Sequence, residues 1–156
     1  MKDRNFSYYL EKGKEYINSD SVDKGAAAIK KALQLNPHNE YAVFELGKIH
    51  YIRQDFRKAR ELYTKAFELN NKFILPRLEL GKIYLAQRNL RLAEREFRFV
   101  ISSSDNTDFK LESLYELGKI YRLFSTGDRT REMEKLMSEL ADSVKLGEES
   151  IKSVSY

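Results

Sequence analysis

The stretch ELGKIHY at residues 45–51 returns almost unchanged as ELGKIYL at residues 79–85 and as ELGKIYR at residues 116–122. A related stretch, EKGKEYI, comes earlier at residues 11–17. The motif therefore occurs four times, and its glycine is Gly13, Gly47, Gly81 and Gly118 in turn. Successive glycines are 34, 34 and 37 residues apart. A fixed period in this range is typical of a solenoid built from one repeated unit. The sequence therefore predicts about four such units.

Each unit has the pattern of two helices. In the second unit, one helical stripe is formed by Val43, Leu46, Gly47 and His50. Ala59 lies on a stripe with the same helical spacing on the following helix. Small residues at Gly47 and Ala59 predict a close crossing of the two helices. Good N-caps stand before the second helix of the first three units, at Ser21, Asp55 and Asn89, and Asp128 is the displaced candidate in the fourth. The expected helices are 5–19, 22–35, 40–53, 56–69, 73–87, 90–102, 109–125 and 129–145.

This pattern resembles the tetratricopeptide repeat family. The resemblance rests on Leu-Gly pairs followed by an aromatic residue, then Ala, an aromatic and Ala, and it covers roughly residues 6–146. It implies an all-α, right-handed superhelical solenoid of antiparallel helix pairs, with eight helices and a short C-terminal tail. We expect one domain, 1–156, with repeats at about 6–39, 40–73, 74–107 and 111–146 and a tail at 147–156. Lys12 departs from the pattern, because the family has leucine there.

Composition narrows the function classes. The chain has no cysteine and only two histidines, so we predict no metal site, and no motif for a cofactor is present. The serines at 102–104 have no catalytic partner, so we expect no enzymatic activity. No stretch resembles a signal peptide or a membrane span, which predicts a cytoplasmic protein. The net charge of +4 is uneven: residues 53–98 carry +6 and residues 99–156 carry −3.

The resemblance implies that the first helix of each pair lines a concave groove. The residue after each motif glycine would point into it, and this residue is always a lysine. Apolar and aromatic residues would flank these lysines. The predicted groove residues are Lys14, Lys48, Lys82, Lys119, Leu10, Phe44, Tyr51, Leu78, Tyr115 and Tyr41. Such a surface suits a partner with acidic and apolar side chains.

The sequence equally allows a second interpretation of these lysines, in which they bind no partner. A glutamate lies three residues before each one, and such pairs can simply stabilise a solvated helix. These glutamates are Glu11, Glu45, Glu79 and Glu116. A carboxylate-binding clamp, as in co-chaperone members of the family, is not expected, because Glu45 or Glu79 would stand at its middle position and repel the ligand.

A second candidate lies on the outer, convex side of the third unit. Arginines recur at helical spacing there, with an aromatic residue beside them: Arg88, Arg91, Arg95, Arg98 and Phe99. The stripe is a candidate site for an anion or a protein partner. We favour the alternative of a solvated face, partly balanced by Glu94.

The sequence predicts a non-enzymatic protein–protein interaction module or scaffold that binds a peptide or protein in its groove. Self-assembly into a homo-oligomer is a variant, since the basic middle and the acidic end favour head-to-tail contact. The alternative is a helical-repeat protein that binds single-stranded RNA, because lysines interleaved with aromatic residues supply that chemistry.

Overall fold

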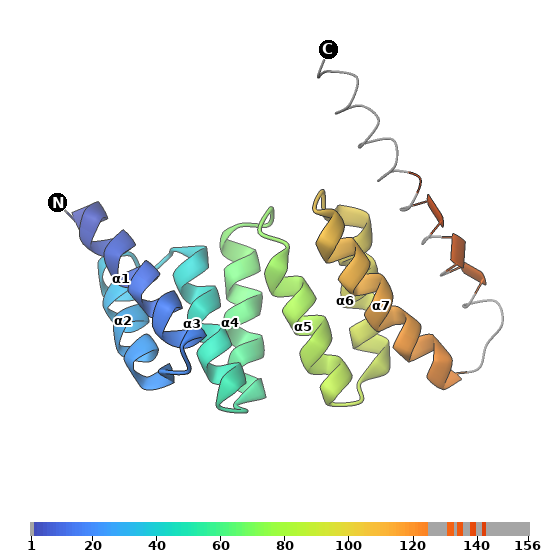
Figure 1. Ribbon diagram of the computed structural model, residues 1–156, viewed down its shortest axis with the longest axis horizontal. Helices are drawn as coiled ribbons and strands as arrows, with labels where there is room; N and C mark the ends of the chain where they lie inside the picture. The colour runs from blue at the N-terminus through green and yellow to red at the C-terminus, as the bar shows by residue number, and fades with distance from the viewer. Residues whose placement is uncertain (1, 125–130, 133, 136–137, 140–141, 143–156) are drawn as a thin grey trace, which may run out of the picture. The chain divides into compact units, whose positions relative to one another are not determined.

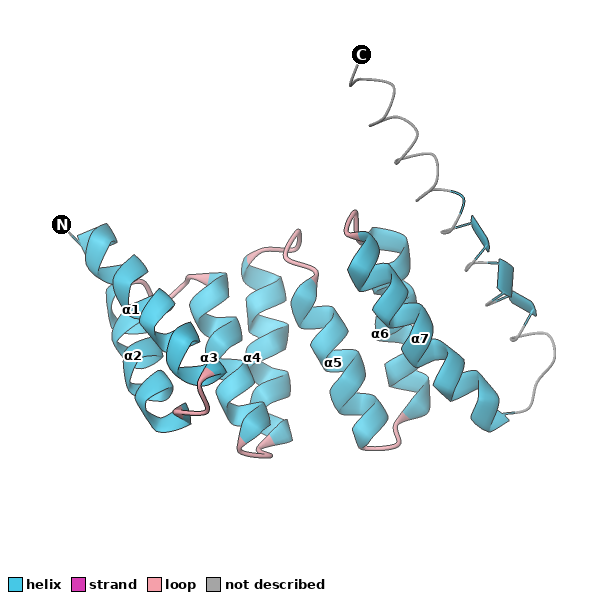
Figure 2. Cartoon of the chain, viewed as in Figure 1, coloured by secondary structure: helices cyan, strands magenta, loops and turns pink. Residues whose placement is uncertain are grey.

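The computed structural model describes residues 2–124, 131–132, 134–135, 138–139 and 142. Every regular element in these residues is an α-helix, which confirms the predicted all-α class (Figures 1 and 2). The described helices are α1 (Lys2–Asn18), α2 (Val22–Leu35), α3 (Glu40–Ile52), α4 (Phe56–Leu69), α5 (Leu75–Ala86), α6 (Leu90–Ser103) and α7 (Thr107–Phe124). The described residues thus form seven helices where the sequence predicts eight. The helix expected at 129–145 lies largely outside them, and the tail at 147–156 lies wholly outside them.

The chain divides into two compact units, Met1–Ile83 and Tyr84–Tyr156, with the boundary inside α5. In the first unit, α1 packs against α2 and α3 packs against α4, and α3 also contacts α1 and α2 (Figure 1). In the second unit, α6 packs against α7. We call α1, α3, α5 and α7 the first helices, because each opens a predicted repeat.

The repeated glycines mark close helix crossings, as the sequence predicts. A Cβ atom on Gly47 would lie 2.7 Å from Cε1 and 2.8 Å from Cδ1 of the buried Tyr63 ring on α4. Gly13 on α1 faces Ile29 of α2 in the same way, at 2.7 Å from Cγ1. No side chain fits at these positions without moving a core residue, so the glycine period records helix packing.

The turn inside each helix pair is a Schellman motif repeated at the same period. Asp20, Gln54 and Arg88 adopt left-handed backbone angles, with φ of 60°, 61° and 57°. The N–H of the next residue donates to a carbonyl five residues back, as in Asp55 N to His50 O at 2.9 Å. These bonds satisfy carbonyls that the ending helix would otherwise leave without donors.

The second helices begin directly after the predicted caps, at Val22, Phe56 and Leu90. The Asp55 side chain accepts from Lys58 N at 3.1 Å, which is the expected N-cap bond. The side chains of Ser21 and Asn89 make no cap hydrogen bond. The sequence therefore located the helix starts correctly but predicted cap bonds that only one of the three residues makes.

Candidate binding groove

The lysines of the first helices are mostly paired with glutamates of their own helix. Lys14 Nζ donates to Glu11 at 2.9 Å, Lys82 Nζ to Glu79 at 2.8 Å, and Lys119 Nζ to Glu116 at 2.8 Å. Each pair spans three residues and is at least partly exposed to solvent. At these three positions the structure has the arrangement of helix-stabilising pairs, which leaves little net positive charge for a partner.

Lys48 differs from the other three lysines. Its Nζ donates to Asn18 Oδ1 at 3.2 Å, across from α3 to the last residue of α1. Asn18 lies five residues after the motif glycine of its repeat, and the matching residues in the next two repeats are Ile52 and Ala86. Neither of those side chains can accept a hydrogen bond. This difference accounts for the bond from Lys48 to the preceding helix.

The diversion of Lys48 leaves Glu45 in an unusual state. Glu45 is only 7% exposed, and its Oε2 is buried without a hydrogen-bond partner in the part of the chain that the structure describes. Burial raises the pKa of the Glu45 carboxyl, and the ammonium groups of Lys48 and Lys14 offset part of that rise. A buried carboxylate of this kind is costly to the fold unless a donor reaches it.

Glu45 lines a pocket with a volume of about 360 Å³. We call it the groove pocket; its lining residues are Phe44, Glu45, Lys48, Tyr51, Ile52, Tyr63, Leu75 and Glu79. The Phe44 ring packs at a tilt against Tyr63, with centroids 5.1 Å apart, and edge-to-face against Phe73, with centroids 5.3 Å apart. The pocket thus combines a packed aromatic wall with two carboxylates and one ammonium group.

The predicted groove residues separate into exposed and buried groups. Tyr41 and Tyr115 are 45% and 62% exposed, and Tyr51 is half-buried at the groove pocket. Leu10 and Phe44 are each 7% exposed, and Leu78 is fully buried. Leu78 therefore belongs to the core and presents no surface to a partner. The position of Leu78 on α5 lies between neighbouring helices and the expected groove, and the side chain packs on the side of the helices.

The arginine stripe on the predicted convex side does not form one site in the structure. Arg88 lies in the turn before α6, and Arg95 Nη2 donates to the buried Glu96 at 2.8 Å. Arg98 binds Glu132 through both Nη atoms, at 2.9 and 2.8 Å, and these bonds raise the pKa of Arg98. Arg91 is exposed, and Phe99 is half-buried. Carboxylates thus bind two of the four arginines, Arg95 and Arg98.

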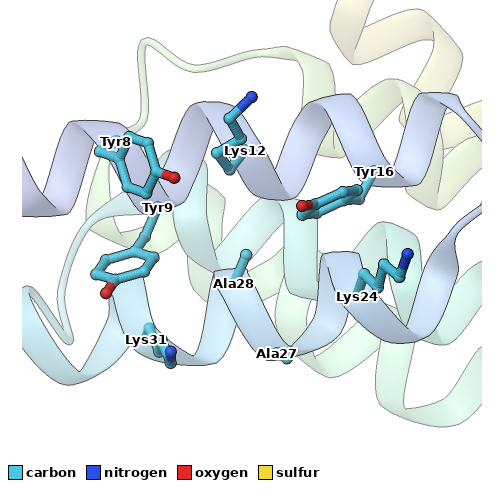
Figure 3. Close-up of a pocket in the computed structure, with 8 residues that line it drawn as sticks. All are labelled: Tyr8, Tyr9, Lys12, Tyr16, Lys24, Ala27, Ala28 and Lys31. Carbon is cyan, nitrogen blue, oxygen red and sulfur yellow. The ribbon is translucent and has the colours of Figure 1, made fainter.

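Sequence reasoning missed a second hollow, of about 240 Å³, between α1 and α2 (Figure 3). We call it the tyrosine hollow; its lining residues are Tyr8, Tyr9, Lys12, Tyr16, Lys24, Ala27, Ala28 and Lys31. The Lys24 and Lys31 amines lie 5.9 and 5.2 Å from the centroids of the Tyr16 and Tyr9 rings. The signal was present in the sequence, because Tyr8, Lys12 and Tyr16 stand one helical turn apart.

The matching positions of the next repeat explain why this hollow is open. Ala42 and Leu46 correspond to Tyr8 and Lys12, and both pack into the core cluster that contains first-repeat residues such as Ile29. In the first repeat the same face keeps Tyr8 58% exposed. The departure at Lys12 thus marks the end of the apolar stacking surface, as expected for a terminal repeat.

Models of the tetratricopeptide repeat match residues 6–39 and 40–73. These matches fall on the two repeats whose boundaries the 34-residue period predicts. Residues 6–73 are thus two tetratricopeptide repeats. A comparison with curated protein sequences finds no significant match.

Solved tetratricopeptide-type structures share the fold. A crystal structure of MamA has a TM-score of 0.77 at 18% identity, covering 90% of this chain and 81% of that one. The pilF protein of Pseudomonas aeruginosa gives 0.75 at 17% identity, covering 96% and 72%. The first tetratricopeptide domain of Spaghetti (RPAP3), bound to the HSP90 peptide SRMEEVD, gives 0.69 at 19% identity, covering 79% and 95%. At these identities the likeness concerns the fold alone.

The remaining site classes find no support in the described residues. They contain no group of histidine, aspartate and glutamate side chains arranged to hold a metal ion. None of their helices has the length and apolar character needed to cross a bilayer. The tetratricopeptide repeat is in general a protein-interaction module, so the groove pocket is the main candidate site.

Proposed function

We propose that this tetratricopeptide repeat protein is a non-enzymatic scaffold that binds a segment of another protein, with the groove pocket as the main contact. The observation that supports this most is the pocket itself, which opens between α3, α4 and α5 and is walled by Phe44, Tyr51 and Tyr63. Aromatic side chains in a well-packed pocket supply most of the binding energy in many interfaces. Tyr51 and Ile52 keep enough exposed area to contact a partner.

The related fold supports a peptide as the form of the partner. The Spaghetti (RPAP3) domain is solved with a peptide bound, and it covers 79% of this chain. The peptide sequence itself is not transferred, because identity is 19%. The partner segment would carry apolar side chains for the groove pocket and an acidic group for Lys48, the one groove lysine without a glutamate pair. Lys14, Lys82 and Lys119 would contribute little net charge.

A selection from a random peptide library tests the proposal. Peptides retained by the full chain should bind the variant Tyr51→Ala/Ile52→Ala at least about tenfold more weakly, mainly through faster dissociation. A matched control, Tyr8→Ala/Leu35→Ala, removes similarly exposed apolar area elsewhere and should bind normally. Equal loss in both variants, or none in either, would contradict the groove pocket as the contact.

Binding of single-stranded RNA is the alternative function. The tyrosine hollow favours it, because it pairs exposed tyrosines with three lysines. The pairing of three of the four groove lysines with glutamates argues against it. Fluorescence anisotropy with a labelled oligouridylate at several salt concentrations separates the two, because RNA affinity should fall steeply as salt rises.

Self-assembly is compatible with the same scaffold. The uneven charge of the sequence, +6 over residues 53–98 and −3 over residues 99–156, would favour head-to-tail association of copies. Light scattering at increasing salt should then show the particle mass fall towards that of one chain. A mass that stays at one chain at low salt would rule this variant out.

A further inference from the structure

Glu45 is the exception among four glutamates at one register. Glu11, Glu79 and Glu116 each accept a hydrogen bond from the lysine three residues on, while Oε2 of Glu45 is buried and accepts none in the described residues. More than nine-tenths of the Glu45 side-chain surface is hidden from solvent. Buried carboxylates are normally paired or hydrogen-bonded, so an unmet acceptor at this place points to a donor from outside the chain.

The Glu45 residue borders an open space, although its Oε2 atom is itself covered. Glu45 lines the groove pocket, whose volume of about 360 Å³ has room for a side chain. Phe44, Tyr51 and Tyr63 line the same space. Aromatic faces attract cations, and a guanidinium group also stacks on them. A carboxylate beside aromatic rings is therefore suited to a basic side chain.

We propose that Glu45 binds the arginine or lysine side chain of the partner segment that occupies the groove pocket. The proposal rests on the proposed function and adds the chemistry of one partner residue. A carboxylate at this register repels a carboxylate ligand, so the pocket selects against acidic groups at this point. The partner would then carry a basic residue for Glu45 next to an acidic one for Lys48.

Asn18 is the positioning residue of this site. By accepting the bond from Lys48 Nζ at 3.2 Å, it holds the chain's own ammonium group away from Glu45. Without that bond Lys48 would make the pair with Glu45 that the other three repeats make. The other charged groups near Glu45 are Glu11 and Lys14 from α1, which bond to each other, and Glu79 from α5, which is bonded to Lys82.

The test is an NMR titration of the full chain with N-acetyl-arginine amide, using the side-chain carboxyl carbons of glutamate as the signal. The neutral analogue N-acetyl-citrulline amide is the matched ligand. We expect a saturable shift of the Glu45 signal with arginine only, together with a fall in the Glu45 pKa. Glu45→Gln should weaken arginine binding by at least about tenfold. Glu116→Gln, the same change at the same register outside the pocket, should leave it unchanged.

Two results would overturn the inference: equal shifts with arginine and citrulline, or equal arginine binding by wild type and Glu45→Gln. If the Glu45 signal does not shift with arginine but shifts in Lys48→Met, Lys48 is bonded to the Glu45 carboxylate in solution, and the inference is likewise overturned. The proposed function is judged separately. If library peptides still lose affinity on Tyr51→Ala/Ile52→Ala while arginine fails to bind, the groove function stands and the basic partner residue does not.

Discussion

Two stretches of the same sequence, ELGK at residues 45–48 and at residues 79–82, fold into the same helical register with different results. In the third repeat, Glu79 and Lys82 form a pair at 2.8 Å, and both remain partly exposed. In the second repeat, Lys48 bonds to Asn18 instead, and Glu45 is buried without a partner at Oε2. Identical residues at a 34-residue period therefore do not make identical sites.

The difference comes from the preceding first helix. Lys48 meets Asn18 at the end of α1, whereas the residue that matches Asn18 one repeat later is Ile52. Ile52 lines the groove pocket together with Glu79 but offers no acceptor for Lys82. In a repeat protein each unit contacts only its neighbours, so one neighbouring residue can change the chemistry of a repeated motif.

The largest effect on stability should come from replacing Gly47, the glycine within the stretch at residues 45–48. Gly47→Leu should lower the free energy of unfolding by about 1–3 kcal/mol, because any side chain there collides with the buried Tyr63 ring. Gly81→Leu should cost a similar amount if both stretches rest on equivalent helix crossings. Urea denaturation measures this, with the exposed Lys65→Leu as the control. A tolerant Gly81 beside an intolerant Gly47 would mean that the two repeats already differ in backbone packing.

The next effect is a reciprocal exchange of the residues that separate the two stretches. In Asn18→Leu, Lys48 loses its acceptor and should pair with Glu45, so the pKa of Glu45 should fall. In Ile52→Asn, Lys82 gains an acceptor and should leave Glu79, so the carboxyl-carbon signal of Glu79 should shift. Carboxyl-carbon NMR reads both changes, with a pH series for Glu45. If Glu45 titrates identically in wild type and Asn18→Leu, the choice of partner by Lys48 does not depend on Asn18.

Most of the fold could be predicted from the sequence, because the residues that determine it recur in each repeat. Gly13 and Gly47 lack a side chain for the same steric reason, 34 residues apart, so the period exposes it. The helix starts after Ser21, Asp55 and Asn89 follow from the same turn in each repeat. Local rules of this kind act within one repeat and need no knowledge of its neighbours.

Only part of the candidate site could be predicted from the sequence. The sequence shows that a lysine follows each motif glycine. The bond from Lys48 to Asn18, however, joins residues 30 apart and depends on how α1 and α3 pack. The burial of Leu78 depends in the same way on neighbouring helices, so helix periodicity placed it on a groove surface although it is a core residue. The contrast between Asn18 and Ile52 was visible in the sequence, but its effect required the packed structure.

A third, smaller effect concerns pH. Burial raises the pKa of Glu45 in the folded chain above its ordinary value of 4.5, so the folded state holds this proton more strongly than the unfolded state. Stability should therefore fall as pH rises from 4.5 through the raised value. Glu45→Gln removes this dependence, so its stability relative to wild type should increase over that window and stay level below it. Urea midpoints on both sides of 4.5 measure the difference. A difference that is constant with pH would show that Glu45 is paired in solution.

The smallest effect extends the comparison of matched residues to the turns. Asp20 and Gln54 hold the same left-handed backbone, with φ of 60° and 61°. That conformation costs an ordinary side chain about 1–2 kcal/mol, while aspartate tolerates it better and glycine adopts it freely. Glycine also gives the unfolded chain about 0.4–1 kcal/mol of extra entropy. Gln54→Gly should thus stabilise by a few tenths to about 1 kcal/mol, whereas Asp20→Gly should be close to neutral. Gln54→Ala is the control for loss of side-chain contacts, since it keeps the strained φ. Equal effects of glycine at both turns would mean that the two repeats carry the same turn strain, and that their difference lies only in the contact between Asn18 and Lys48.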